Sequence, residues 1–506
     1  MHTRSLLSVL FAASSACIAE RGPFTNRMAQ SATSYLARAA RQPVNWQPWG
    51  REAFALAAKL DRPVMLYVGG DSCRWCAETD RAIYTDPEIG SLINALFVPI
   101  RVDRDERPDV AQRYQAAVER LAGLRGWPLT VFLTADGAPF FGGTYFPADD
   151  PVTGRGLKQI LPEVAQSYRE QRPFIVQHAA LVRQLILASG GSGVRGVLQR
   201  APIEAEIARV RTELEAAVGT GAVVGSVMHA EAASLLLGEY ARESDTASLA
   251  VARRALDVLI DSSAAAREDP PRLVQAALLR GLTTAWLVTR ERRYRDVAVG
   301  LARALASERP DPLFADQEAY VIEAVLRAAA TFDDAAAQRR ARSGLDALLQ
   351  RMYARGRGVR HSVPGAGPRL LQDQVHVAGA CVSAYQETGD ARYLDVARDL
   401  AAIMEENYAD PLGGYYDTAL PRPADAAMPA LVDRTKHVLD DMLPGANAWA
   451  AHVLLRLAEA TGDAAYRRRA AAALESVAGA VTGARVRAAT FLGVAREVLA
   501  SRAPAP

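Results

Sequence analysis

The chain has 506 residues, of which 50% are hydrophobic and 23% are charged. This is the length of about three average domains of ~150 residues, so a single small motif is excluded and two or three domains are expected. The 59 basic and 57 acidic residues leave a formal charge of +2, which argues against nucleic acid or an acidic membrane surface as a partner. Four cysteines are too few for a fold held together by disulfides.

The first 20 residues have the layout of a short secretory signal. One charge at Arg4 is followed by an apolar run over residues 6–13 and by small residues, with cleavage expected after Ala16 or Ala19. The run is too short to span a membrane, and no other stretch is apolar enough, so no membrane span is expected. The signal predicts a secreted or periplasmic protein, and the alternative is a cytoplasmic chain that starts at Met28.

The segment from about 40 to 150 alternates between strand-like and helix-like stretches. Strands are predicted at 64–68, 97–102, 129–133 and 140–141, the last two flanking a turn at 135–138. Helices are predicted near 73–84, 86–96 and 108–122. This alternation predicts a small α/β layer fold.

After about residue 154 amphipathic helices rich in Ala, Leu and Arg replace the strands. The turn at 388–393, Thr-Gly-Asp-Ala-Arg-Tyr, is nearly repeated at 461–466, and glycine suits a helix end while aspartate caps the next helix. About twelve helices between 203 and 499 form six hairpins, for which a closed double ring is favoured over an open solenoid. A Gly/Ser-rich linker at 189–200 separates the helical domain, residues 201–500, from the α/β part.

The first chemical clue is the pair Cys73 and Cys76 at C-x-x-C spacing, after an apolar strand and at the start of a helix. Free N–H groups and the dipole at a helix N-terminus favour a thiolate, and Arg74 adds a positive charge. Cys73 is therefore the expected nucleophile and Cys76 the resolving thiol. Pro128, which follows Trp127 and precedes a strand, is placed to form a cis proline that faces the cysteines.

The spacing of the cysteine pair also permits a metal-binding role or a purely structural one. The pair can be half of a zinc site, but none of the seven histidines lies near it at motif spacing, so no metal and no cofactor are expected. The cysteines can also be structural and inert.

Several segments together resemble one family, the spermatogenesis-associated protein 20 family (DUF255, YyaL-like proteins). The resemblance runs from residue 24 to about 170. It rests on residues 26–27, 34–36, 42–50, 52–54, Cys73-Arg74-Trp75-Cys76, 102–109, 126–133 and 142–147.

The resemblance implies a thioredoxin-like domain over residues 24–188, with trailing helices, followed by an α/α toroid similar to six-hairpin glycosidases and sugar epimerases. Trp75 and Trp127 fall within the shared motifs, beside the cysteines and the proline. The chain departs from the family at Arg74 and Ala39, where members usually carry His. The dithiol is kept while nearby proton carriers or metal ligands are lost.

The helical half carries candidate pocket residues near the predicted starts of alternate helices. In closed α/α rings the pocket lies where the inner helices begin, so these groups can converge as acids and bases on a sugar-like ligand. The alternative is that acidic residues at helix starts are ordinary caps. The candidates are Asp316, Glu318, Asp373, His376, Asp440, Asp441, His437 and Asn447.

Two functional hypotheses follow. The first is a thiol–disulfide oxidoreductase, with a protein thiol or disulfide as substrate or redox partner, whose helical ring binds a partner or small ligand. The second is a carbohydrate-active or carbohydrate-binding toroid carrying a structural thioredoxin-like domain.

Overall fold

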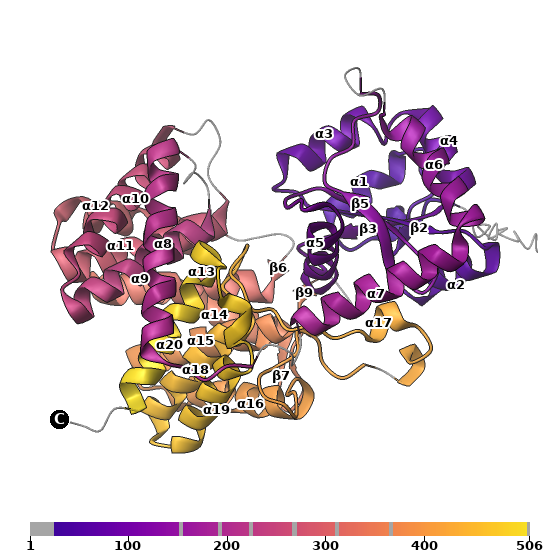
Figure 1. Cartoon of the computed structure of the whole chain (residues 1–506). Coiled ribbons are helices and arrows are strands. Elements are labelled where there is room, and N and C mark those ends of the chain that lie inside the picture. The colour runs from indigo at the N-terminus through magenta and orange to yellow at the C-terminus, as the bar shows by residue number, and fades with distance from the viewer. Residues whose placement is uncertain are drawn as a thin grey trace, which may run out of the picture.

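The computed structural model describes residues 25–502 except 151–154, 191–194, 222–225, 266–270, 309–312, 364–367 and 422. The predicted leader at 1–20 lies outside the described residues. The N-terminal α/β domain and the helical domain form two bodies joined along one side (Figure 1). Among the described residues, no helix has both the length and the apolar character needed to cross a membrane.

The N-terminal domain is built on a five-stranded sheet in the order β1-β3-β2-β4-β5, the arrangement of thioredoxin. The β1, β3 and β2 strands are parallel, whereas β4 runs antiparallel to β2 and to β5. Every residue of β2, β3 and β4 is buried, which explains why these strands read as continuous apolar runs in the sequence. The strands are β1 (Gln47–Pro48), β2 (Val64–Gly69), β3 (Val98–Asp103), β4 (Leu129–Leu133) and β5 (Pro139–Gly143).

Helices cover both faces of this sheet. Alternate residues of β2 face opposite cores: Leu66 packs in the core shared with α2, α5 and α7, and Met65 in the core shared with α1, α4 and α6. The helices are α1 (Ser34–Arg38), α2 (Arg51–Leu60), α3 (Arg74–Ala82), α4 (Pro87–Leu96), α5 (Pro108–Ala122), α6 (Leu157–Glu170) and α7 (Arg172–Gly190). Since α7 extends to Gly190, the first two residues of the predicted linker are helical and not flexible coil.

Within the described residues, the second domain is a closed ring of six helical hairpins. The inner helices α9, α11, α13, α15, α18 and α20 each pack against the next, and α20 returns to α9. The outer layer consists of α8, α10, α12, α14, α16 and α19. In the part of the chain that the structure describes, twelve long helices form the (α/α)6 toroid expected from the sequence, in place of an open solenoid. They are α8 (Arg200–Thr220), α9 (Val227–Glu243), α10 (Thr246–Ala265), α11 (Arg272–Thr289), α12 (Arg292–Ser307), α13 (Ala315–Thr331), α14 (Ala335–Met352), α15 (Leu371–Thr388), α16 (Ala391–Asn407), α18 (Ala446–Thr461), α19 (Ala464–Glu475) and α20 (Ala489–Arg502).

The repeated Gly-Asp turns join helices as predicted. Gly389 ends α15 with a positive φ of 70°, and the Asp390 carboxylate accepts a hydrogen bond from the first turn of α16. Gly462 and Asp463 do the same between α18 and α19. A left-handed glycine followed by a capping aspartate reverses the chain in two residues, which suits a tight hairpin.

Short strands and one short helix shape the mouth of the ring. The β6 strand (Leu313–Phe314) pairs with β9 (Ser362–Val363), and β7 (Tyr353–Ala354) pairs with β8 (Gly358–Val359). The β6–β9 pairing brings the loop around His361 against the start of α13, where the Ala315 amide donates to the His361 carbonyl.

The loop between α16 and α18 connects the toroid to the first domain. Its short helix α17 (Pro429–Val432) places Ala430 inside the core of the thioredoxin-like domain. Arg113 of α5 donates to the backbone carbonyls of Ala430 and Asp433, at 2.7 and 2.6 Å. Arg183 of α7 forms a two-pronged ion pair with the Asp433 carboxylate. These contacts hold the thioredoxin-like domain over the end of the ring where the inner helices begin.

Candidate functional site

The cysteine pair lies where β2 meets α3. Cys73 caps α3, and its Sγ accepts a hydrogen bond from the Cys76 amide at 3.1 Å. The two cysteines are joined as a disulfide. Cys73 is 8% exposed and Cys76 is fully buried, so an incoming thiol reaches the Cys73 sulfur more easily.

The sheet register brings three loops to the same edge as this disulfide. Gly69 at the end of β2 pairs with Asp103 at the end of β3, and Val68 pairs with Leu129 at the start of β4. The loop before β4 contains the Trp127–Pro128 peptide bond, which is cis as the sequence predicts. We name this edge, with Cys73, Cys76, Trp75 and Pro128, the redox face.

Arg104 connects the loops of the redox face. Its Nη2 donates to the Ser72 hydroxyl at 2.7 Å, directly before Cys73. Its guanidinium lies 5.5 Å from the Trp127 ring centre. Arg104 is buried, whereas Arg74, which the sequence pattern singles out, is exposed. Sequence reasoning missed Arg104, and the available signal was its position immediately after a buried strand.

Trp75 stands out from the redox face into solvent. Its side chain is 58% exposed, and its ring lies 5.7 Å from that of Tyr145, which is 38% exposed. An exposed aromatic pair therefore lies beside the Cys73–Cys76 disulfide.

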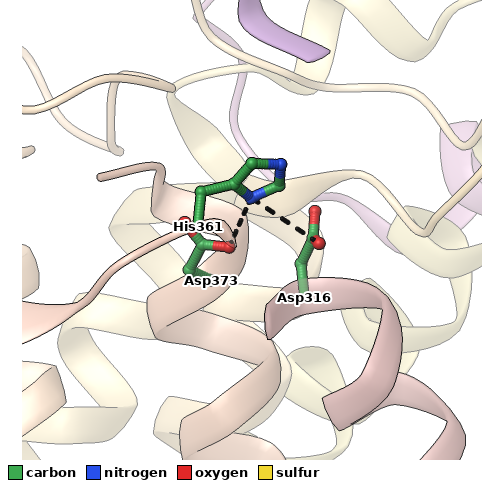
Figure 2. Close-up of side chains that lie close together, drawn as sticks. All are labelled: Asp316, His361 and Asp373. Carbon is green, nitrogen blue, oxygen red and sulfur yellow. Dashed lines mark hydrogen bonds and ion pairs between the residues drawn. The ribbon is translucent and has the colours of Figure 1, made fainter. Parts of the chain in front are cut away.

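At the mouth of the toroid, Asp316, His361 and Asp373 come together from α13, the β8–β9 loop and α15 (Figure 2). All three are buried, and one potential ligand atom from each lies within 4.8 Å of the others. His361 Nδ1 lies 2.8 Å from an Asp373 oxygen and 3.8 Å from an Asp316 oxygen. The other Asp373 oxygen accepts the Leu370 amide at 3.0 Å, so Asp373 also caps α15.

Hydrogen-bond chemistry assigns a charge to His361. Its Nε2 lies 2.7 Å from the Asp105 carbonyl oxygen, which only accepts, so this nitrogen carries a proton. Burial lowers the pKa of His361, but the Asp373 and Asp316 carboxylates outweigh it and raise that pKa to about 10. Both ring nitrogens therefore donate, and the side chain is an imidazolium that ties the toroid to the thioredoxin-like domain.

The three residues form a buried ion pair in this structure. Both nitrogens of His361 take part in its hydrogen bonds, Nδ1 with Asp373 and Nε2 with the Asp105 carbonyl. Burial raises the pKa of Asp316 to about 7, against the opposing effect of His361.

Next to this ion pair, a recess opens between the two domains, and its empty volume is about 420 Å³ when the open solvent at its mouth is included. We name it the interdomain recess. One wall belongs to the thioredoxin-like domain and the other to the toroid. The polar and aromatic lining residues are Arg104, Asp105, Gln112, Trp127, Asp316, Gln317, Gln372 and Asp441.

The structure places the predicted toroid residues in different surroundings. Asp316 and Asp441 line the recess, whereas Asp373 lies behind it in the ion pair with His361. Glu318 pairs with Arg272 at 3.0 Å, and the Asn447 side chain holds the backbone of Tyr415 through two hydrogen bonds of 2.8 Å. These last two residues are structural.

The remaining candidates, His376, Asp440 and His437, are held by packing or by hydrogen bonds. His376 is buried against Tyr320 and Trp449, and neither ring nitrogen has a hydrogen-bond partner within the described part of the chain. Burial lowers the pKa of His376 to about 3, so the ring is neutral. Asp440 accepts the amides of Gly445 and Thr490. The Gln372 amide lies 3.0 Å from His437 Nδ1.

Sequence reasoning missed His361, Gln317 and Gln372 along with Arg104. His361 lies in a loop between short strands, and no periodic pattern marks it. Gln317 and Gln372 stand beside the acidic residues Asp316 and Asp373 at helix starts, and that position was the only signal available for them.

Comparison with known proteins identifies the first domain. Residues 25–186 match the family described as "Protein of unknown function, DUF255". Spermatogenesis-associated protein 20 of Rattus norvegicus and of Homo sapiens are each 37% identical over 163 residues, which is 32% of this chain and 21% of the relative. An uncharacterized protein of Caenorhabditis elegans is 37% identical over 170 residues, 34% of this chain and 23% of the relative.

The chain thus spans about a fifth of the length of the curated relatives that it matches. Among solved structures, an unsaturated glucuronyl hydrolase specific for heparin aligns with a TM-score of 0.44 and 14% identity, over 60% of this chain and 97% of that one. A D-mannose isomerase aligns with a TM-score of 0.42 and 11% identity, over 55% and 87%. The similarity to the DUF255 family and to the spermatogenesis-associated protein 20 relatives thus covers the first domain of this chain, residues 25–186.

Proposed function

We propose that the protein carries out thiol–disulfide exchange at the redox face. The observation that carries this proposal is the position of Cys73, whose sulfur caps α3, accepts the Cys76 amide and is bonded to the Cys76 sulfur. A thiolate formed at this cap keeps the hydrogen bond and meets the positive end of the helix dipole, both of which favour the charged form. The same features make Cys73 a good leaving group and nucleophile.

The residues around Cys73 have separate roles in the proposed exchange. Cys76, buried one turn along α3, attacks a mixed disulfide on Cys73 and releases the substrate. Arg104 positions the loop before Cys73 through Ser72 and stacks near Trp127. Trp75 and Tyr145 supply a contact surface for a protein thiol or disulfide. Stabilisation of the reduced form makes the pair more oxidising than thioredoxin.

The first experiment measures the reduction potential of the pair. In the full chain with Cys17→Ser and Cys381→Ala, Cys73 and Cys76 are the only cysteines left. After equilibration with glutathione buffers, free thiols are counted by alkylation and mass. We expect a reversible two-electron transition above about −270 mV, the thioredoxin value. A pair that never oxidises, or never reduces, over the whole range contradicts the proposal.

A second candidate function is carbohydrate binding or turnover in the interdomain recess. It is favoured by the carboxylates and amides that line the recess where the inner helices begin. Asp441 is the informative position, because its carboxylate makes no hydrogen bond or ion pair within the described residues, whereas Asp373 is held by His361. This function predicts that sugars raise the melting temperature, and that Asp441→Ala removes the increase. The result of this sugar-binding test does not depend on the reduction potential of Cys73 and Cys76.

A further inference from the structure

The interdomain recess lies next to the redox face and is lined by residues that support the cysteine loop. Arg104 lines the recess and also donates to Ser72, the residue before Cys73. Trp127 lines it too, and is followed by the cis proline at the start of β4. The residues that hold the cysteine loop therefore form one wall of a recess whose other wall belongs to the toroid.

The lining of the recess indicates what it can hold. Asp105, Asp316 and Asp441 contribute carboxylates, against the single guanidinium of Arg104. These carboxylates accept hydrogen bonds, the amides of Gln112 and Gln372 both donate and accept, and the Trp127 ring is a flat apolar surface. Pro108, Ala111, Met442 and Leu443 add apolar side chains to the lining. Such a mixed lining suits a small molecule that carries hydroxyl groups on an apolar frame, and the excess of carboxylates over guanidinium groups in the lining disfavours an anion.

Asp441 is the most available of these groups. Burial raises the pKa of its carboxyl, and the charges of Arg487, Arg125 and Arg104 oppose that effect. Arg104 and Asp441 line the same recess from opposite sides of the domain boundary. A ligand between them contacts both domains.

We propose that the interdomain recess binds the body of a low-molecular-weight thiol that is rich in hydroxyl groups and carries no negative charge, and that its sulfur exchanges at Cys73. This rests on the proposed function and names a substrate class for it. The toroid thereby contributes a specificity surface to the redox face, and a protein substrate is not the sole class that the site accepts.

The reaction balances without any further reagent. The thiolate of the first substrate molecule attacks Cys73 Sγ, the Cys73–Cys76 bond breaks, and Cys76 leaves as a thiolate that takes up a proton. A second substrate thiolate attacks the substrate sulfur of the mixed disulfide and releases Cys73 as a thiolate. The Cys73 thiolate takes up the proton that the second substrate thiol lost. Two substrate thiols are thereby oxidised to one disulfide, and the cysteine pair gains two electrons and two protons.

The test compares the rates at which three thiols reduce the disulfide of the full-length chain. The thiols differ in the part of the molecule that is not the sulfur. The probes are 1-thio-β-D-glucose, which is neutral and hydroxyl-rich, N-acetylcysteamine, which is neutral and has no hydroxyl, and 2-mercaptoethanesulfonate, which is anionic. Reduction of the pair is followed by quenching, alkylation and mass. We expect the rate with thioglucose to saturate with concentration, and the rates with the other two thiols to stay linear.

Two variants locate the effect in the recess. Gln112 is a half-buried residue of α5, and Gln112→Trp fills part of the recess with a bulky side chain. Asp441→Asn removes the charge of the carboxylate and keeps the size of the side chain. Each is expected to lower the second-order rate with thioglucose about tenfold, the scale of one hydrogen bond to a charged group, and to leave the other two thiols unchanged. Glu459→Gln, an exposed carboxylate on α18, is the matched control.

The outcomes separate the two proposals. If no thiol reduces the pair, the proposed function fails. If all three thiols react without saturation and the variants change nothing, exchange stands and the recess has no role in it. If the variants slow all three thiols equally, the recess acts on the disulfide and not on the substrate, which also overturns this inference. Melting temperatures of the variants show that each is folded.

Discussion

The redox face and the interdomain recess are assembled in different ways. The redox face takes its sulfurs, its exposed aromatic ring and its capping amide from residues 72–76, one turn of chain after a buried strand. The recess takes its groups from the loop after β3, from α5, and from the starts of α13, α15 and α18, which are hundreds of residues apart. A site made by one turn of chain is visible in a sequence, whereas a site made by docking two domains is not.

The two regions also differ in how charge is handled. At the redox face, backbone amides and a helix terminus are arranged around a sulfur that is slightly exposed. At the toroid mouth, full charges are buried and neutralise one another, as between His361 and Asp373. Substitutions at the redox face should change the rate of thiol–disulfide exchange. Substitutions at the toroid mouth should change the free energy of unfolding and the docking of the two domains.

The largest expected effect is on exchange at the redox face. Cys73→Ser should reduce disulfide exchange to the uncatalysed level, because the sulfur that forms the mixed disulfide is lost and the Cys76 sulfur is fully buried. The measurement is the rate of thiol release from a disulfide substrate. Cys381→Ser is the control, since Cys381 is a buried free thiol in the toroid and its loss should leave the rate unchanged.

Next in size is the loss of the buried ion pair. Asp373→Ala leaves the Leu370 amide without its partner and leaves the His361 charge with only the more distant Asp316 carboxylate, and should lower the free energy of unfolding of the toroid by about 3 kcal/mol. Urea denaturation followed by circular dichroism measures it. A loss below about 1 kcal/mol would show that the pair is solvated. The redox potential of Cys73 and Cys76 should not change.

Domain docking depends on Arg113. Arg113→Ala removes two hydrogen bonds from a guanidinium to backbone carbonyls of the toroid loop, and should cost about 2 kcal/mol. The two domains should then unfold in separate calorimetric transitions. Arg120→Ala, on the same helix but exposed, is the control. A single unchanged transition would contradict the role given to this loop.

A pH dependence distinguishes the imidazolium from a neutral ring. The folded-state pKa of His361 is about 10, above the ~6.5 of an unfolded histidine. Its stabilising effect is therefore complete below pH 6.5 and is lost as the pH rises through 10. His361→Gln should be less stable than the parent at pH 6, and this deficit should shrink by pH 9.5. His178→Gln, exposed on α7, should show the same small difference at both values.

The smallest effect concerns the hairpin turns. Asp463→Ala removes the cap of α19, where the carboxylate accepts the Ala465 amide at 2.8 Å, and should cost about 1 kcal/mol. Thermal unfolding measures it. Because the turn is local, neither the redox face nor the recess should respond. A larger loss, or a change in exchange rate, would mean that the ring is more strongly coupled to the first domain than its contacts indicate.

The elements that the sequence predicted well are those whose signal is local. The buried strands at 64–68 and 129–133, the cysteine cap on α3 and the Gly-Asp turns each depend on a few neighbouring residues. Asp316 and Asp373 lie in the first turns of α13 and α15 as expected, whereas Asp441 lies in the loop before α18, and the partners of these residues were not foreseen. Asp373 meets His361 only because β6 pairs with β9, and that pairing depends on tertiary packing.

The sequence by itself determined the strands and helices from β2 to β5, the hairpin repeat and the position of the cysteine pair, because backbone propensity, periodicity and capping act within a few residues. It did not reveal β1, α1 or α2. Only the tertiary structure decided that Arg104 rather than Arg74 is the buried guanidinium at the cysteine loop, that His361 is charged, and that two domains enclose a recess. Burial and the distances between charges depend on how distant segments pack. Those two quantities set which groups are neutral, charged or free to bind.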